Sequence, residues 1–111
     1  MPHNARPVHE VKATLFRVLG HPARVRILEL LRDGERSVST LQAELDLDSS
    51  GTSQHLAALR RIGVVESRRE GTTVWYRVSD DRVFDMLAAA RDVITRQLAQ
   101  QQTILADLST S

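Results

Sequence analysis

The sequence predicts a mainly helical domain that carries one small β-hairpin. Over most of the chain, apolar residues recur at spacings of three and four, the period of an amphipathic helix. Residues 64–78 instead alternate apolar and polar around a Glu-Gly pair, which is typical of two strands joined by a turn. With 111 residues and 41% hydrophobic residues, the chain has the size and composition of one globular domain. We expect the order helix, helix, helix, helix, strand, strand, helix.

The N-terminal residues 1–7 contain two prolines and no apolar period, so we expect a flexible tail. Val8, Val11 and Leu15 then mark one face of a helix over residues 8–19. The glycine that follows is a common C-terminal signal for a helix.

Pro22 suits the first turn of a second helix, PARVRILELLRD, which an Asp-Gly pair ends. Its inward face is expected to use Val25, Leu28 and Leu31, and Ile27 and Leu30 widen that face. Ser39 and Gln42 have the capping-box spacing, which predicts that a short third helix starts at residue 40.

Asp48 is the expected N-cap of a fourth helix that runs to about Ile62, where a glycine breaks it. Leu56 and Leu59 lie on the inward face of this helix. We expect the strands to cover Val64–Arg69 and Thr73–Val78.

A last helix is expected over residues 80–108, with Ser79 as its N-cap. At about 1.5 Å per residue this helix would be roughly 43 Å long, more than the rest of a small domain can cover. Its apolar stripe therefore needs a partner, and a second copy related by a two-fold axis is the simplest one. The expected dimer interface combines the first and last helices: Val8, Val11, Leu15, Val83, Leu87, Ala90, Ile94, Leu98, Gln101 and Leu105.

Composition excludes several classes of function. The chain has no cysteine, which rules out disulfides, thiolate metal ligands and thiol nucleophiles. No apolar run is long enough for a membrane helix, and the N-terminus lacks the apolar stretch of a signal peptide, so we expect a cytoplasmic protein without a membrane partner. A net charge of +1 says little about nucleic acid.

The fourth helix and the hairpin together have the layout of a winged helix-turn-helix, which predicts binding to double-stranded DNA. Small polar residues at the front of the helix suit contacts with phosphates and base edges. Arginines beside the hairpin turn suit phosphate or minor-groove contacts. The candidate DNA-binding residues are Ser49, Ser50, Gly51, Thr52, Ser53, Gln54, Arg60, Arg61, Arg68, Arg69, Gly71 and Thr72. The alternative interpretations are a capped helix and a solvated hairpin with no ligand.

Motifs for catalysis and for metal binding are absent. No nucleophile elbow or glycine-rich phosphate loop is visible, so we expect neither catalytic residues nor a cofactor. The four histidines, His3, His9, His21 and His55, have no pair at helical metal-ligand spacing. A site formed by His3, His9 and Glu10 on the N-terminal tail is the weak remaining option, and a partly buried structural role is the better interpretation of His55.

The segments LGHPARVRILELL, SVSTLQAEL and SSGTSQHLAALRRIGVVESRREGTTVWYRV, followed by a long helix, resemble the ArsR/SmtB family of bacterial repressors over residues 8–100. The resemblance implies a homodimer that binds an inverted-repeat operator and leaves it when an inducer binds; it names no inducer. It also implies DNA reading by residues 49–54 and wing contacts near residues 68–72.

The chain departs from the family at its metal sites. Where metal-sensing members place two cysteines, this sequence has Ser37 and Ser39. Where other members place ligands in the last helix, it has Asp81, Val83, Ile94 and Gln97, of which only the aspartate suits a metal. We therefore expect no metal site.

Two further functions are compatible with the sequence. A protein-interaction module could keep this fold and use the last helix to bind a different protein. A metal sensor could use the N-terminal histidines.

Overall fold

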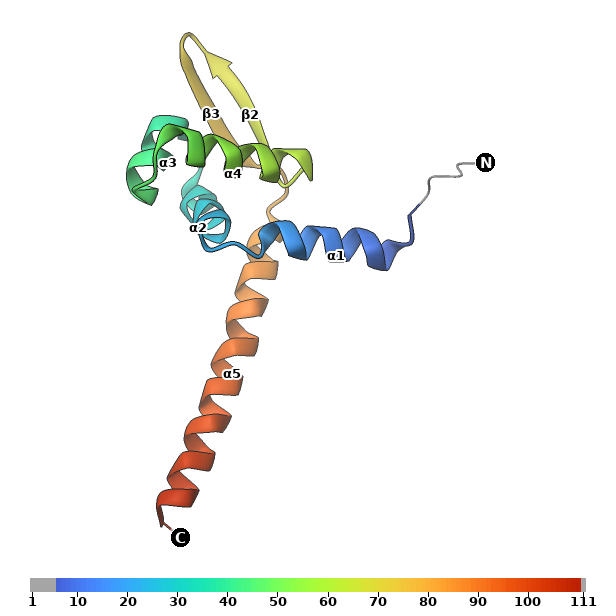
Figure 1. The fold of residues 1–111 in the computed structure, drawn as a ribbon, viewed down its shortest axis with the longest axis vertical. Helices are drawn as coiled ribbons and strands as arrows, with labels where there is room; N and C mark the ends of the chain where they lie inside the picture. The colour runs from blue at the N-terminus through green and yellow to red at the C-terminus, as the bar shows by residue number, and fades with distance from the viewer. Residues whose placement is uncertain (1–5, 111) are drawn as a thin grey trace. The chain divides into compact units, whose positions relative to one another are not determined.

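A computed structural model describes residues 6–110 of the chain, which divide into two compact units after Asp80. The first unit contains helices α1 (Val8–Leu19), α2 (Pro22–Leu30), α3 (Val38–Leu45) and α4 (Ser49–Arg61), a short 3-10 turn η1 (Leu31–Asp33), and strands β1 (Arg36–Ser37), β2 (Val65–Glu70) and β3 (Thr73–Val78). The second unit is helix α5 (Arg82–Thr110). Within the first unit, the β2–β3 hairpin projects from the group of helices (Figure 1).

The predicted order of four helices, a hairpin and a last helix is confirmed, with one unpredicted strand, β1, between the second and third helices. Several helix boundaries follow from local chemistry. Pro22 occupies the first turn of α2, whose N-cap is His21; the ring Nδ1 of His21 accepts a hydrogen bond from the Ala23 amide at 3.2 Å. The second helix ends three residues earlier than predicted, because residues 31–33 tighten into the 3-10 turn. Gly34 closes that turn at φ 128°, a conformation that favours glycine.

The start predicted for the third helix was wrong by two residues. Ser37, and not Ser39, is the N-cap of α3, and its hydroxyl accepts a hydrogen bond from the Thr40 amide at 3.2 Å. The helix therefore begins at Val38. Ser37 also ends β1, so one residue closes a strand and opens a helix.

Helix α4 ends in a Schellman motif that leads directly into the hairpin. The Gly63 amide donates to the Arg60 carbonyl at 3.0 Å, and the Val64 amide donates to the Leu59 carbonyl at 3.2 Å. Gly63 has φ 80°, which fits its place just beyond the helix. The first strand of the hairpin, β2, then starts at Val65, one residue later than predicted.

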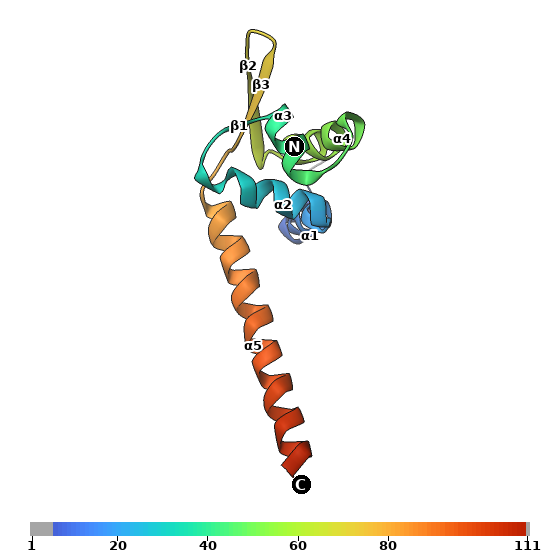
Figure 2. The same ribbon diagram turned by 90° about the vertical axis from the view of Figure 1, so that its left-hand side faces the viewer.

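The sheet has three strands in the order β1-β3-β2, all antiparallel, and not the two that were predicted. The extra strand, β1, pairs Arg36 with Tyr76 and Ser37 with Trp75, and lies beside β3 in Figure 2. At the other end of the hairpin, Gly71 and Thr72 form a two-residue loop, with Gly71 at φ 62°.

The core of the first unit lies between the helices and the sheet. Helix α4 packs against α2, α3 and β2, and α3 packs against β1 and β3. The largest fully buried apolar residues are Ile27, Leu28, Leu41, Leu56, Leu59 and Val65. Val25, expected to face inward, is only half-buried, while Ile27 is fully buried.

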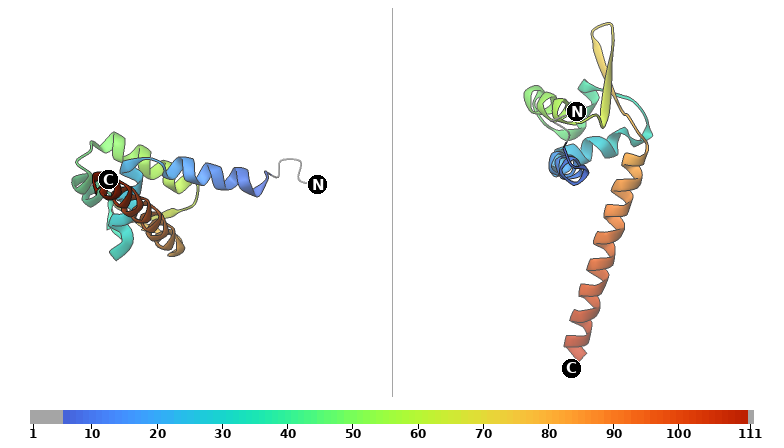
Figure 3. Two further views of the ribbon diagram at one scale, coloured as in Figure 1. Left: turned by 90° about the horizontal axis from the view of Figure 1, so that it is seen from below. Right: turned by 90° about the vertical axis from the view of Figure 1, so that its right-hand side faces the viewer.

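Helix α5 is one continuous helix of 29 residues, about 43 Å long (Figure 3). It begins at Arg82, two residues later than predicted, and continues past the predicted end to Thr110. No helix within residues 6–110 is long and apolar enough to cross a membrane.

Candidate nucleic-acid interface

The front of α4 presents an exposed polar edge. Asp48 is the N-cap of this helix, and its carboxylate accepts the Gly51 amide at 2.7 Å. Ser49, Ser50, Ser53 and Gln54 are all exposed over the first turns that follow. Four of the side chains predicted to contact DNA therefore lie together on the surface, at the positive end of a helix.

Thr52 differs from these neighbours because its side chain is fully buried, with 0% exposure. Its hydroxyl donates a hydrogen bond to the Asp48 carbonyl at 2.9 Å, which satisfies the polar atom inside the fold. Thr52 thus stabilises the start of α4 from its buried side and does not belong to the exposed edge.

The fold itself explains why residue 51 is a glycine. A Cβ atom on Gly51 would lie 2.8 Å from Oδ1 of Asp48, the atom that caps the helix. A side chain at this position would therefore push the cap away. The sequence suggested close approach of the backbone to DNA as the reason for this glycine, whereas the contact present in the structure is with Asp48.

A cluster of His21, Arg24 and His55 ties α4 to α2. The Arg24 Nε donates to Nδ1 of His55 at 3.1 Å, and its Nη1 donates to the Val18 carbonyl of α1 at 3.0 Å. The rings of His21 and His55 lie 4.3 Å apart at an angle of 52°. Burial lowers the pKa of His55, and the nearby charges of His21 and Arg24 lower it further.

This cluster bears out the interpretation of His55 as a partly buried structural histidine. It holds the middle of α4 while the front of the helix stays exposed. Sequence inspection did not connect these residues, because His21 and His55 are distant in the chain and no spacing rule joins them.

The two remaining groups of predicted contacts lie at the end of α4 and on the hairpin. Arg60 and Arg61 are exposed in the last turn of α4, about 16 Å along the helix from its front. Arg68 and Arg69 are exposed on β2, and Gly71 and Thr72 form the exposed loop of the hairpin.

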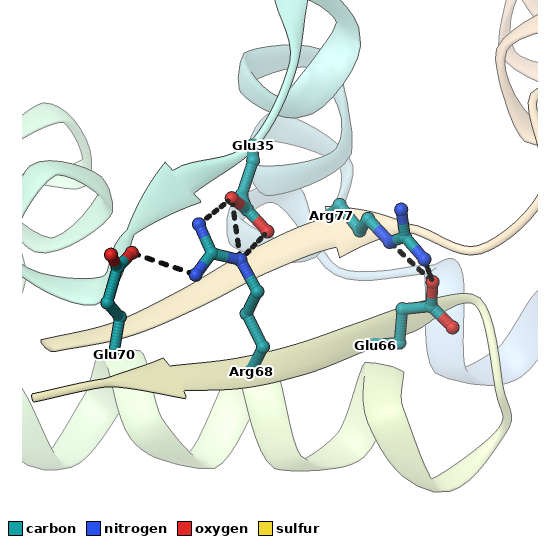
Figure 4. Close-up of polar contacts among 5 residues, drawn as sticks. All are labelled: Glu35, Glu66, Arg68, Glu70 and Arg77. Atoms are coloured by element: carbon teal, nitrogen blue, oxygen red, sulfur yellow. Dashed lines mark hydrogen bonds and ion pairs between the residues drawn. The ribbon is translucent and has the colours of Figure 1, made fainter.

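Arg68 is held by carboxylates (Figure 4). Its Nε lies 3.0 and 2.9 Å from the two carboxylate oxygens of Glu35, and its Nη2 lies 2.6 Å from Oε1 of Glu35. Its Nη1 donates to Glu70 at 2.9 Å. These hydrogen bonds lower the pKa of Glu35 and raise the pKa of Arg68. The carboxylate partner in the loop before β1 was not expected from the sequence.

Serines occupy the positions at which metal-sensing members of the family place two cysteines. The Ser37 hydroxyl, which caps α3, lies 3.2 Å from the hydroxyl of Ser39 and 2.9 Å from that of Thr40. Within residues 6–110, no group of three or more histidine, aspartate and glutamate side chains has the geometry to hold a metal ion. Of the suggested N-terminal site, His3 lies outside the described residues, while His9 and Glu10 are exposed on α1.

Exposed apolar side chains line both helices that were predicted to dimerise. On α1, Val8 and Val11 are exposed and Leu15 is half-buried. On α5, Ile94 is 56% exposed and Leu105 is 63% exposed. The predicted members Ala90, Leu98 and Gln101 are exposed as well, while Leu87 is half-buried and Val83 is buried. Leu108, which continues the predicted stripe at helical spacing, is exposed too, as are three apolar residues that were not predicted to take part: Phe16, Val93 and Ile104.

The sequence is similar to known bacterial regulators. A family model described as "Bacterial regulatory protein, arsR family" matches residues 21–67. The uncharacterized HTH-type transcriptional regulator Rv0081 of Mycobacterium tuberculosis is 43% identical over 105 residues, which cover 94% of this chain and 92% of Rv0081. The biofilm growth-associated repressor of Agrobacterium fabrum is 38% identical over 87 residues, covering 75% of this chain and 74% of that protein.

Solved structures agree with this likeness. The crystal structure of Rv0081 matches with a TM-score of 0.80 over 87% of this chain and 98% of that chain. The solution structure of Mb0332 from Mycobacterium bovis, described as a homodimeric winged helix-turn-helix DNA-binding domain, matches with a TM-score of 0.75 at 30% identity, over 88% of this chain and 94% of that chain. The fold of this chain therefore matches the fold of winged helix-turn-helix regulators.

Proposed function

This chain belongs to the ArsR family of bacterial regulatory proteins, and we propose that it acts as a homodimeric repressor that binds an inverted-repeat operator in double-stranded DNA. Members of the family are DNA-binding transcriptional regulators with a winged helix-turn-helix, and this chain is such a regulator rather than an enzyme. The dimer, the repressor role and the form of the operator are the proposed parts.

The observation that carries the proposal is the exposed polar edge of α4. Ser49, Ser50, Ser53 and Gln54 stand on a capped helix N-terminus, and helix-turn-helix proteins insert such an end into the major groove. Hydroxyls suit phosphate oxygens and either kind of base edge, while the amide of Gln54 suits the paired donor and acceptor of adenine. Ser residues would then position the helix, and Gln54 would select bases.

The proposed dimer rests on the exposed apolar side chains of α1 and α5. A water-soluble regulator gains free energy by covering such a stripe, at about 25 cal/mol per Å². The homodimeric description of Mb0332 supports a second copy as the cover. The repressor role is supported by the name of the Agrobacterium relative. Such a role would place the protein in the cytoplasm, where bacterial DNA lies.

Metal control is not part of this proposal. The chain has no cysteine, and of the two serines at the family's thiolate positions Ser37 caps α3 and Ser39 lies within hydrogen-bond distance of Ser37. We infer that the regulator responds to a signal other than a thiolate-bound metal, or to its own abundance.

The proposal is tested by selecting duplexes from fragmented genomic DNA with the purified protein. We expect an inverted repeat among the bound fragments, and we expect Gln54→Ala to change which bases are preferred at one position of each half-site, by about 1–3 kcal/mol of discrimination. Gln100→Ala, on α5, is the matched control and should leave the selected sequence unchanged. Recovery of no duplex above background would end the proposal.

A protein-interaction module is the second candidate, favoured by the exposed stripe of α5. Size-exclusion chromatography with light scattering separates the two. A stable dimer of the purified chain supports the regulator, and a monomer that binds no DNA supports the module.

A further inference from the structure

The two neighbouring arginines of β2 lie on opposite faces of the hairpin. Side chains alternate along a strand, and residues that pair across two strands share a face. Arg69 pairs with Val74, on the face that contains the buried Val65. Arg68 pairs with Trp75, on the other face, which we call the outer face.

The outer face is rich in carboxylates. Arg68 lies between Glu35 and Glu70, with its guanidinium 5.6 Å from the ring centre of Trp75, and Arg77 is paired with Glu66 nearby (Figure 4). These residues amount to three carboxylates and two guanidiniums, so the outer face has a net negative charge. A DNA phosphate that approached Arg68 would compete with two carboxylates already bound to it and would be repelled by them.

Arg69 stands in the opposite situation. It is exposed, and within the described part of the chain, residues 6–110, no hydrogen bond or ion pair holds its side chain. It lies one residue from Glu70 and two from the loop residue Gly71, near the tip of the hairpin. The charge of Arg69 is therefore available to a ligand that contacts the face of the hairpin on which Val65 lies.

The contact with Glu35 gives Arg68 a structural role. Glu35 lies in the loop between η1 and β1, so its bidentate contact ties the middle of β2 to a segment 33 residues earlier in the chain. Strand β1 holds the hairpin through β3, at Tyr76 and Trp75, and the Glu35 contact restrains the neighbouring strand β2 at the level of Trp75.

We propose that Arg69 contacts a DNA phosphate, and that Arg68 is a positioning residue that holds the hairpin in place through Glu35. This inference rests on the proposed function, because it assumes that the hairpin meets DNA. It divides two residues that the sequence treated as equivalent.

The salt dependence of operator binding tests the division. Each phosphate contact contributes about 0.9 to the slope of log affinity against log salt. We expect Arg69→Ala to weaken binding about tenfold and to lower that slope by about one unit. Arg68→Ala should weaken binding and leave the slope unchanged. Arg77→Ala, on the outer face, is the matched control for a lost arginine and should also leave the slope unchanged.

Conservative variants separate positioning from contact. Arg68→Lys keeps the charge but loses the bidentate geometry, so a positioning role predicts the same loss of affinity as Arg68→Ala. Glu35→Gln should weaken binding as well, and combining it with Arg68→Ala should add no further loss. Glu66→Gln removes the same charge from the same face without touching Arg68 and serves as the control.

Three outcomes would overturn the inference. They are a lowered slope for Arg68→Ala, an unchanged slope for Arg69→Ala, and tighter binding by Glu35→Gln than by Glu66→Gln. Each of these requires that the unmodified protein bind its operator. If the unmodified protein binds no duplex, the proposed function itself has failed, so the two failures are distinguishable. Circular dichroism of each variant checks that the hairpin variants are folded.

Discussion

Asp48 and Gly51 act as a pair at the start of α4. The carboxylate of Asp48 caps the helix by accepting the Gly51 amide, and the space for that carboxylate exists because Gly51 has no Cβ atom. Two effects thus oppose each other at residue 51. Alanine would favour the helix by up to about 1 kcal/mol, and it would also displace a cap that is worth about 1 kcal/mol.

We therefore predict that the effect of Gly51→Ala depends on residue 48. In the unmodified protein the substitution should change the free energy of unfolding by little. In an Asp48→Ala background, where there is no cap to lose, it should stabilise the protein by up to about 1 kcal/mol. Urea unfolding of the four variants at one protein concentration measures the difference. Ser53→Ala should behave alike in both backgrounds, and a Gly51→Ala effect that does not depend on residue 48 would contradict the pairing.

Helix α5 has an exposed apolar stripe that a partner could cover. Its apolar residues Ile94, Leu98 and Leu105 recur at helical spacing and are exposed in the single chain. A lysine placed among them would bring an unpaired charge into any interface that covers the stripe.

Leu98→Lys is accordingly predicted to convert the dimer to a monomer at micromolar concentration and to weaken operator binding with it. Thr103→Lys adds the same charge on the opposite side of α5 and should leave the dimer intact. Light scattering coupled to size exclusion gives the masses directly. Equal behaviour of the two variants would place the dimer interface elsewhere.

The helix boundaries show how far local chemistry predicts this fold. Asp48 and Pro22 act on amides and dihedral angles within a few residues, so their roles were visible in the sequence. Ser37 was missed in favour of Ser39, because each serine lies before a usable amide and the choice depends on β1. That strand is two residues long and pairs with Tyr76 and Trp75, about forty residues later, so no local sequence pattern predicts it.

Part of the candidate site could likewise be predicted from local sequence, and part depends on contacts between distant segments. The polar front of α4 could be predicted, since it follows from the helix start and from the family resemblance. The burial of Thr52 and the pairing of Arg68 with Glu35 could not, because both depend on how distant segments pack. Strand alternation alone does place Arg68 and Arg69 on opposite faces, and this signal was available in the sequence.

At the scale of the whole molecule, the proposed dimer sets the geometry of its operator. A two-fold related pair of α4 helices reaches two half-sites on one side of the duplex, separated by about one helical turn or a multiple of it. The affinity of the dimer then depends on engaging both half-sites at once.

An insertion of 5 base pairs between the half-sites should therefore lower affinity to that of a single half-site, a loss of roughly 100-fold. The insertion turns one half-site to the far side of the duplex. Gel-shift titrations of the two operators measure the loss, and spacer substitutions without a change of length are the control. An unchanged affinity would mean that the two protomers bind independently.

The position of Trp75 gives this protein a built-in spectroscopic probe. It is the single tryptophan of the chain, and it lies on the outer face of the hairpin beside the guanidinium of Arg68. All tryptophan fluorescence of the protein therefore originates in the wing, and its wavelength and quenching report the environment of the Arg68–Glu35 pair without any added label.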